Sequence, residues 1–247
     1  MLNGFVRVTS LTGDAPWTAT ATYLATTKTQ ESRLQVLRPG EGSFLAAPFE
    51  IGFRLKDEAA QFMRVELFGE GGELISRYVM SCTDIPQNVD QSMKIDFEVQ
   101  APEEQGLLVL SLANQYGQLI ELHSFSQTLL AKGASWINPY SDLSPRIIIE
   151  RPNQGAVIRG GKLQLGGRVR AVASRQLKAK IISQEGKVLG QKLIRLSNPD
   201  QNGISRYLGE ISFRMDKPTD ALLVVYQDSY QRPQMRLLTS VPVKLIP

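Results

Sequence analysis

The sequence predicts an all-β chain made of two tandem antiparallel β-sandwiches. Short segments alternate apolar and polar residues with a period of two, and turn-forming residues recur about every 8–12 residues, which is typical of such folds. The segment Phe49–Leu55 is matched by a second alternating segment, 163–169, at an offset of 114 residues. No segment shows a convincing helical period. These observations predict two copies of one sandwich unit.

The chain has 247 residues, which is enough for two units of about 100 residues each. We predict an N-terminal arm or spacer at 1–32, a first domain at 33–131, a linker at 132–144 and a second domain at 145–247. A unit of this size can bury a sufficient core without disulfides or metal ions.

Seven strands are predicted in the first domain, at 34–37, 49–55, 63–68, 74–79, 93–99, 107–113 and 119–125. Two hairpin turns separate adjacent strands within this series, at 69–72 and 114–117. Both turns contain glycine, which adopts positive φ without steric cost. Each hairpin predicts an antiparallel pair of neighbouring strands.

Seven strands are also predicted in the second domain, at 146–150, 163–169, 177–182, 188–193, 211–213, 222–226 and 241–245. Gly186 lies 114 residues after Gly72, so the first hairpin turn is repeated as well. Pro242 lies inside the last strand and predicts an edge position or a bulge there, because proline has no N–H for the ladder.

Residues 17–26 of the arm, WTATATYLAT, alternate strictly and place Trp17 and Tyr23 on one face. Two interpretations are open. A Thr-rich segment of small side chains can be a solvated spacer. Alternatively, the segment is a strand, and it would then pair with an exposed sheet edge of its own or of a neighbouring molecule.

The second domain carries a set of turn and core positions with defined spacing. These are Ile147–Ile149, Pro152, Gly155, Val157, Leu165-Gly166, Gly186–Leu189 and Val241–Leu245. In these positions it resembles the immunoglobulin-like domain first described in bacterial spore germination proteins. The first domain matches more loosely, through Ala47-Pro48 and Gly72–Leu74. The resemblance implies an immunoglobulin-like sandwich in each domain and an extracytoplasmic, often lipoprotein-borne, binding or packing role.

The expected location of the protein in the cell is based on this resemblance, and the N-terminal sequence does not determine it. No run of about 18 apolar residues is present, and Met1–Thr9 lacks the layout of a signal peptide. Either the protein is cytoplasmic, or a signal was removed before Met1. We expect an extracytoplasmic protein, at the cell surface or secreted, on the second assumption.

The chain lacks the residue sets of common enzymes. It has one histidine, His123, which we place on the solvent side of its strand, and one cysteine, Cys82, which we interpret as a small buried hydrophobe. Single residues of each type exclude the usual zinc ligand sets. Nucleotide-binding and nucleophile motifs are missing, and the paired acids lie in turns. We therefore expect a non-enzymatic protein with no cofactor and no metal.

The two domains have opposite charge. Residues 33–131 carry 7 Lys and Arg against 14 Asp and Glu, a net charge of −7. Residues 145–247 carry 18 against 7, a net charge of +11. The basic candidates are Lys162, Arg168 and Arg170 on one strand and Lys178 and Lys180 on another. In an immunoglobulin-like sandwich these strands belong to different sheets, which predicts a basic girdle instead of one patch.

Two classes of partner suit this charge distribution. One is a protein, including a second copy that associates head to tail into a homo-oligomer or filament. The other is an anionic envelope polymer, a carbohydrate or a membrane surface, held by the basic second domain. Nucleic acid is not expected, because no aromatic residues interleave with the basic ones. Trp136 and Tyr140 of the linker either wedge the seam between the domains or offer a stacking surface for a sugar.

Overall fold

The computed structural model describes residues 32–139, 145–170, 175–228 and 235–247. The predicted arm, apart from Ser32, lies outside them. We call residues 32–139 the N-terminal half and the described residues from 145 onward the C-terminal half. Among the described residues, the longest helix is a three-residue 3-10 turn, η1 (Cys82–Asp84), and none is long and apolar enough to cross a membrane.

Eight strands form the N-terminal half. They are β1 (Leu34–Arg38), β2 (Phe44–Ala46), β3 (Phe49–Leu55), β4 (Phe62–Phe68), β5 (Leu74–Ser81), β6 (Asp90–Ile95), β7 (Glu103–Ala113) and β8 (Leu119–Leu130). The predicted strand 49–55 is matched at both ends. The strand predicted at 93–99 lies at 90–95 instead, and β2 was not predicted because it has only three residues.

Eight strands form the C-terminal half. They are β9 (Ile147–Arg151), β10 (Ala156–Ile158), β11 (Lys162–Arg170), β12 (Gln176–Ser183), β13 (Val188–Arg195), β14 (Ile204–Ser212), β15 (Thr219–Asp228) and β16 (Met235–Leu245). The strand predicted at 211–213 is the end of the much longer β14. As with β2, the three-residue β10 was not predicted.

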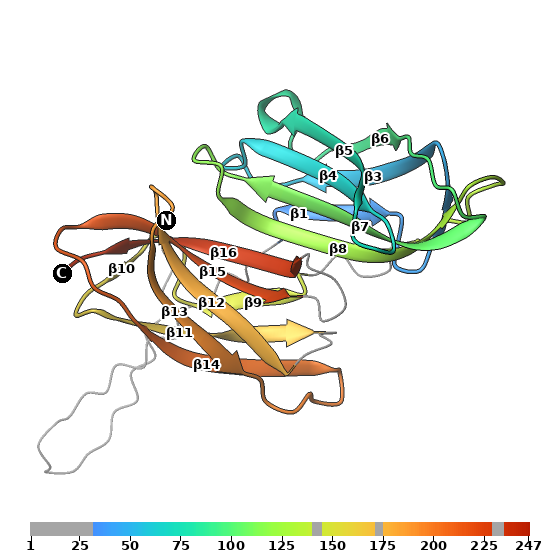
Figure 1. Cartoon of the computed structure of the whole chain (residues 1–247). Helices are drawn as coiled ribbons and strands as arrows, with labels where there is room; N and C mark the ends of the chain where they lie inside the picture. Colours follow the sequence, from blue (N-terminus) through green and yellow to red (C-terminus); the bar gives the residue numbers. More distant parts are fainter. Residues whose placement is uncertain (1–31, 140–144, 171–174, 229–234) are drawn as a thin grey trace, which may run out of the picture.

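Each half is an immunoglobulin-like β-sandwich of two sheets. A three-stranded sheet, β1-β3-β6, packs against β5-β4-β7-β8 in the N-terminal half, and β9-β11-β14 packs against β13-β12-β15-β16 in the C-terminal half (Figure 1). The long strands pair antiparallel, whereas the short β2 and β10 pair parallel with β8 and β16. The same scheme of pairing recurs in both halves.

The larger sheets of the two halves are joined into one sheet of ten strands, because β8 pairs with β16. The shared strands lie between the two bodies in Figure 1. Pro242 belongs to this region, and it lies neither at an edge nor in a bulge. Its carbonyl accepts a hydrogen bond from the Gly155 N–H on the β10 side. Its missing N–H faces the same side, between the segments of β16 that pair with β8 and with β10.

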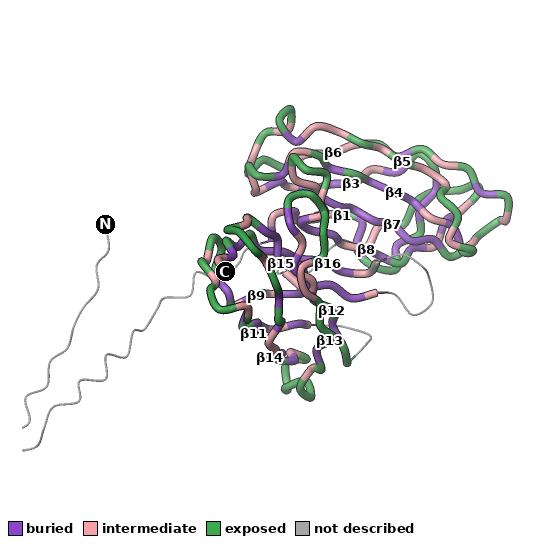
Figure 2. Tube along the Cα trace, turned by 60° about the vertical axis from the view of Figure 1, so that its left-hand side comes forward, coloured by how far each residue is buried: buried purple, intermediate pink, exposed green. Residues whose placement is uncertain are grey.

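Both faces of β7 and β8 are buried (Figure 2). One face, with Leu108, Leu110 and Leu112, fills the N-terminal sandwich. The opposite face carries Val109 and Leu122, which are buried as well. Four residues of the C-terminal half join the same hydrophobic cluster, namely Leu222, Val224, Tyr226 and Leu238. The two larger sheets therefore pack face to face, in addition to sharing a ladder of hydrogen bonds.

Candidate interaction surfaces

The seam between the halves is built first from backbone pairing. Residues 121–123 of β8 pair antiparallel with residues 237–239 of β16. Two side chains extend this contact. The Ser124 hydroxyl donates to the Arg236 carbonyl at 2.9 Å, and the Gln118 amide donates to the Ser183 carbonyl at 2.6 Å. Such bonds to fixed backbone oxygens hold the two halves in one relative position.

Glu121 is a buried acid at this seam, with only 4% of its side chain exposed. Its carboxylate accepts hydrogen bonds from the Ser32 hydroxyl at 2.5 Å and the Arg33 N–H at 2.8 Å, and lies 2.7 Å from His123 Nε2. Burial opposes the charge, but the bonds to His123 and Ser32 and the charges of His123 and Arg33 outweigh burial, so the pKa of Glu121 lies below its ordinary value.

Arg33 links the same network to the C-terminal half. Its guanidinium Nη1 donates to the Ile120 carbonyl at 3.2 Å and to the Ser240 carbonyl at 2.9 Å. The Ser240 hydroxyl in turn donates to the Ile120 carbonyl at 2.9 Å. Arg33 also forms an ion pair with Asp57. This one side chain therefore joins β16, β8 and the loop after β3.

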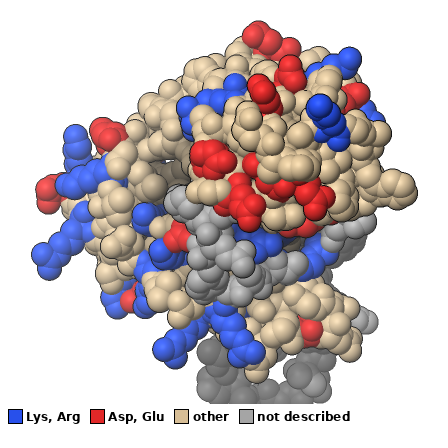
Figure 3. Space-filling model, turned by 45° about the vertical axis from the view of Figure 1, so that its right-hand side comes forward, with Lys and Arg blue, Asp and Glu red and all other residues tan. Residues whose placement is uncertain are grey.

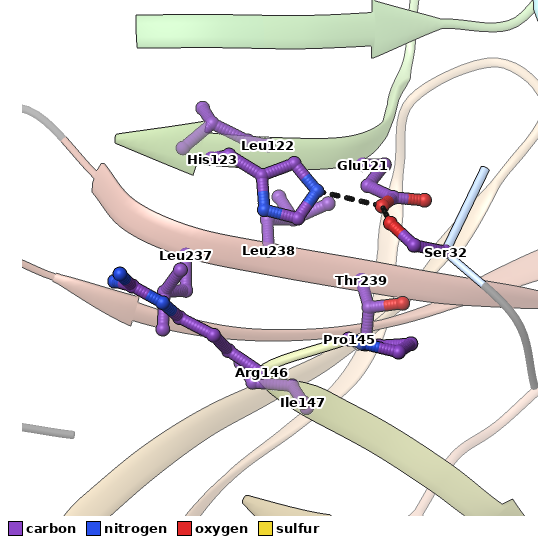
Figure 4. A pocket seen from close by; sticks show the side chains of 10 residues that line it. All are labelled: Ser32, Glu121, Leu122, His123, Pro145, Arg146, Ile147, Leu237, Leu238 and Thr239. Atoms are coloured by element: carbon purple, nitrogen blue, oxygen red, sulfur yellow. Dashed lines mark hydrogen bonds and ion pairs between the residues drawn. The ribbon is translucent and has the colours of Figure 1, made fainter. Parts of the chain in front are cut away.

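A small hollow opens beside Glu121 (Figure 4). Its lining comes from both halves and includes His123, Arg146 and Thr239. Ser32 and His123 converge on the Glu121 carboxylate in this view. The available volume is about 10 Å³, about enough for one water molecule and far too small for an organic ligand. The hollow is therefore part of the contact between the two halves.

The expectation that His123 lies on the solvent side was wrong. Its side chain is only 12% exposed and stacks near Phe125, with ring centroids 6.4 Å apart. It shares the inner face of β8 with Glu121 and Phe125, because alternate residues point to the same side. By contrast, Cys82 is buried as predicted, and burial foremost, with nearby Asp57, raises the pKa of its thiol to about 11. The thiol is thus protonated and unreactive at neutral pH.

The basic candidates lie on two different sheets, as the girdle requires. Lys162, Arg168 and Arg170 are on β11, and Lys178 and Lys180 are on β12. Three of them have acidic partners: Lys162 pairs with Glu210 at 2.9 Å, Arg168 with Glu150 at 2.6 Å and Lys178 with Asp228 at 2.5 Å. The Lys180 ammonium lies 5.2 Å from the centre of the Tyr226 ring, and Arg170 is half-buried. The structure does not bring the five together into one patch.

Among the described residues, one acid of the N-terminal half forms ion pairs with basic residues of the C-terminal half. Glu41 of the N-terminal half lies 3.4 Å from Arg146 and 3.9 Å from Arg236 of the C-terminal half. Most charged side chains remain at the surface, and in Figure 3 acidic residues gather on the upper body while Lys and Arg dominate the body below and to the left. Internal pairing therefore uses only a small part of the charge difference.

Trp136, one of the two aromatic candidates of the linker, does not wedge the seam between the halves. Trp136 is 73% exposed, and its backbone pairs with Phe44 at 2.9 and 2.8 Å. Its segment belongs to the edge of the N-terminal sandwich, where the Ser135 hydroxyl also accepts the Ala46 N–H. A sugar-stacking role for Trp136 stays a prediction. Tyr140, and Trp17 and Tyr23 of the arm, lie outside the described residues.

The outermost strands of the large sheet are β5 and β13, and both expose apolar side chains. The end of β14 lies beside β13: Leu196 just after β13 forms a bridge with Tyr207, and a Cβ added at Gly190 would lie 2.4 Å from the Ser212 carbonyl oxygen. Val188 and Leu193 of β13 are nevertheless 45% and 52% exposed. Within the described residues, β5 pairs with β4 alone. Its Leu74 and Val79 are 42% and 59% exposed. An open backbone edge with exposed apolar side chains is a ready acceptor for another strand.

Two features of the structure were not predicted from the residue patterns. The network around Glu121 was not predicted, because His123 was expected on the solvent side of its strand. The seam itself was missed, although 107–110 and 222–226 are apolar without alternation. Such continuous runs are the signature of strands buried on both faces. That signal could have indicated the face-to-face packing.

Comparisons with known proteins identify no family. No protein-family model matches the chain, and no curated protein matches it significantly. Among solved structures, one match is titin domains z1z2 in complex with telethonin, at 13% identity, 88% of this chain, 97% of that chain and a TM-score of 0.22. The Drosophila receptor protein tyrosine phosphatase DLAR Ig1-2 module matches at 11% identity over 87% of this chain and 100% of that chain (TM-score 0.22).

A third match is red sea bream transglutaminase, at 14% identity and a TM-score of 0.31. It aligns with 87% of this chain but only 32% of its own. Similarity at this level gives no information about activity or partners.

Proposed function

We propose that this chain is a non-enzymatic binding and assembly module that acts outside the cytoplasm at the bacterial cell envelope. It makes protein–protein contacts, including head-to-tail contacts between its own copies. The observation that carries this proposal is the open edge of β5 on a rigid pair of sandwiches. The envelope location rests on the resemblance to immunoglobulin-like domains of spore germination proteins.

Rigidity supports a binding role because a preformed surface loses little entropy on association. The halves are held by the β8–β16 ladder, by the Arg33 bonds and by the buried face between the larger sheets. Linked domains of this kind present their surfaces at a fixed distance and angle. This geometry is suited to repeated contacts along an assembly.

Charge supports a head-to-tail arrangement. Residues 33–131 and 145–247 carry net charges of −7 and +11, and among the described residues the ion pairs between them are those of Glu41 with Arg146 and Arg236. Two copies in head-to-tail contact would place unlike surfaces together, and such a heterologous contact grows into a ring or filament. The alternative, an anionic envelope polymer held by the basic half, is less favoured, because three of its five candidates already have acidic partners.

Light scattering after size exclusion tests the proposal. We expect the mass of the purified chain to rise above 27.4 kDa as the concentration is raised. We expect the rise to be smaller at high salt, because screening weakens contacts between surface charges. A mass that stays monomeric at every concentration and salt level would contradict self-association. Retention on an anionic polymer, abolished by charge reversal at Lys162 and Arg168, would favour the alternative.

A further inference from the structure

We propose that β5 accepts residues 17–26 from the arm of a second copy as an added strand. This inference rests on the proposed function and names the contact through which copies associate. It follows from the state of the β5 edge, the chemistry of the arm and the distance between them.

The edge of β5 carries little protection against strand addition. Natural edge strands are usually guarded by outward charges, prolines, bulges or a covering segment. Strand β5 has no proline and one charged residue, Arg77, which is engaged with Glu66 at 2.7 Å. The bulge in the pairing of β4 with β5 lies at the start of β5, opposite Leu67 and Phe68 of β4. Its counterpart β13 carries two charged residues, Lys192 and Arg195, so the edge of β13 is better guarded against strand addition.

An exposed apolar surface lies beside this edge. Phe62 on β4 and Val79 on β5 are 43% and 59% exposed. The pairing of Phe62 with Ser81 and of Arg64 with Val79 places Phe62 and Val79 on the same face, diagonal to each other. A strand added beyond β5 would place alternate side chains in line with them. Aromatic side chains in those positions would bury the surface.

The composition of residues 17–26 in the arm suits a strand that pairs with this edge. Residues 17–26 contain no charged residue and no proline. Their ten residues are enough to cover the eight of β5. One face carries Trp17 and Tyr23 with two alanines between them, and the other carries four threonines and a leucine. Thr and aromatic residues favour strands, and the alternation offers an aromatic face to Phe62 and Val79.

Distance favours a second copy over the same chain. Ser32 is held at Glu121 on β8, four strand positions away from a strand added beyond β5, which is about 19 Å at about 4.8 Å per strand. The six residues from 27 to 32 span at most about 21 Å when fully extended. The direct line runs from Glu121 along the row of Leu112, Met63 and Met80, through the packed core. A path around the sandwich exceeds the reach of the linker.

Cross-linking between two full-length variants tests the contact. One copy carries Tyr23→Cys, and the other carries Val79→Cys. Each also carries Cys82→Ala, so that the engineered thiols are the only ones. We expect a disulfide-linked dimer only when the two are mixed. The matched control replaces Val79→Cys with Val188→Cys on β13, an exposed residue on a strand that carries two charges, and we expect little product from it. A bridge formed within one molecule of the double variant Tyr23→Cys/Val79→Cys would overturn the assignment to a second copy.

Association measured by light scattering gives an independent readout. Val79→Lys guards the edge with a charge, and Thr20→Pro with Thr22→Pro prevents the arm from forming a strand. We expect both to abolish the rise in mass, and Val188→Lys to retain it. If the unaltered chain associates and both variants still do, the contact lies elsewhere and this inference fails while the proposed function stands. If the unaltered chain neither associates nor cross-links, both fail.

Discussion

Glu121 shows how a charge is tolerated inside an all-β chain. Its carboxylate receives a hydroxyl, a backbone N–H and an imidazole within 2.8 Å. A buried carboxylate without such partners would cost several kcal/mol or lose its charge. Its partners come from the chain entering β1 and from β8 itself, so the network forms only once these segments are assembled. The charge is thus a means of fixing the position of Ser32 and Arg33.

The first prediction concerns the pH dependence of stability. The pKa of Glu121 is lower in the folded chain than in the unfolded chain, where a glutamate titrates at about 4.3. The ionised form therefore stabilises the fold above that pH, and its contribution is lost as the pH falls through the folded value. We expect Glu121→Gln to lower the free energy of unfolding by about 1–3 kcal/mol at neutral pH.

Urea denaturation of both chains at a series of pH values measures this difference. The other carboxylates titrate in both chains, so they cancel in the comparison. The difference between the two chains should shrink below about pH 4. A difference that stays constant from neutral pH to about pH 3 would show that the charge of Glu121 is not responsible.

Strand β11 shows how closely two strands can approach at a glycine. The register between β9 and β11 shifts between Gly166 and Gly167. A Cβ at Gly167 would lie 2.0 Å from the Ile148 carbonyl oxygen and 2.6 Å from the Tyr207 hydroxyl. That hydroxyl donates to the same carbonyl at 2.9 Å. The two glycines therefore allow close backbone packing in the middle of a strand.

The second prediction tests this approach. We expect Gly167→Ala to destabilise the chain by about 2–4 kcal/mol, because the backbone of β9 must move and the Tyr207 hydrogen bond must break. Gly209→Ala on the neighbouring β14 is the matched control. Its nearest atom, Ile194 Cγ1, would lie at 3.5 Å, an ordinary contact. Thermal unfolding of both variants measures the effect, and equal stability of the two would refute the assignment.

At the scale of the element, local pattern predicted most strands but not their partners. The alternating pattern predicted both ends of the strand at 49–55 correctly. Glycine-containing turns predicted the β4–β5 and β12–β13 hairpins. Strands β2 and β10 were missed because three residues carry no readable period. They form because long neighbouring strands offer free hydrogen-bonding groups to the passing chain.

At the scale of the whole molecule, the face between the larger sheets makes two sandwiches into one body. Leu238 belongs to β16 but joins the hydrophobic cluster of the N-terminal half, together with Tyr226. The core of the C-terminal half is a separate cluster that includes neither residue. The two halves therefore share buried surface without sharing a core.

The third prediction concerns cooperativity. We expect the chain to unfold in a single calorimetric transition, because opening one half exposes the apolar face of the other. Leu238→Asp buries a charge in that face and should divide unfolding into two transitions. Val157→Asp on β10 changes an exposed residue and should leave one transition. Two transitions in the unaltered chain would show that the seam does not couple the halves.

The sequence by itself determined that the chain is all-β, where its turns fall and that two similar sandwiches follow each other. These features depend on alternation and on glycine and proline, which act over a few residues. The tertiary structure decided that β8 pairs with β16, that His123 is enclosed beside Glu121, that Trp136 is exposed and that β5 pairs with β4 alone among the described strands. Each of these depends on contacts between residues far apart in the chain, and the local pattern of either partner does not specify them.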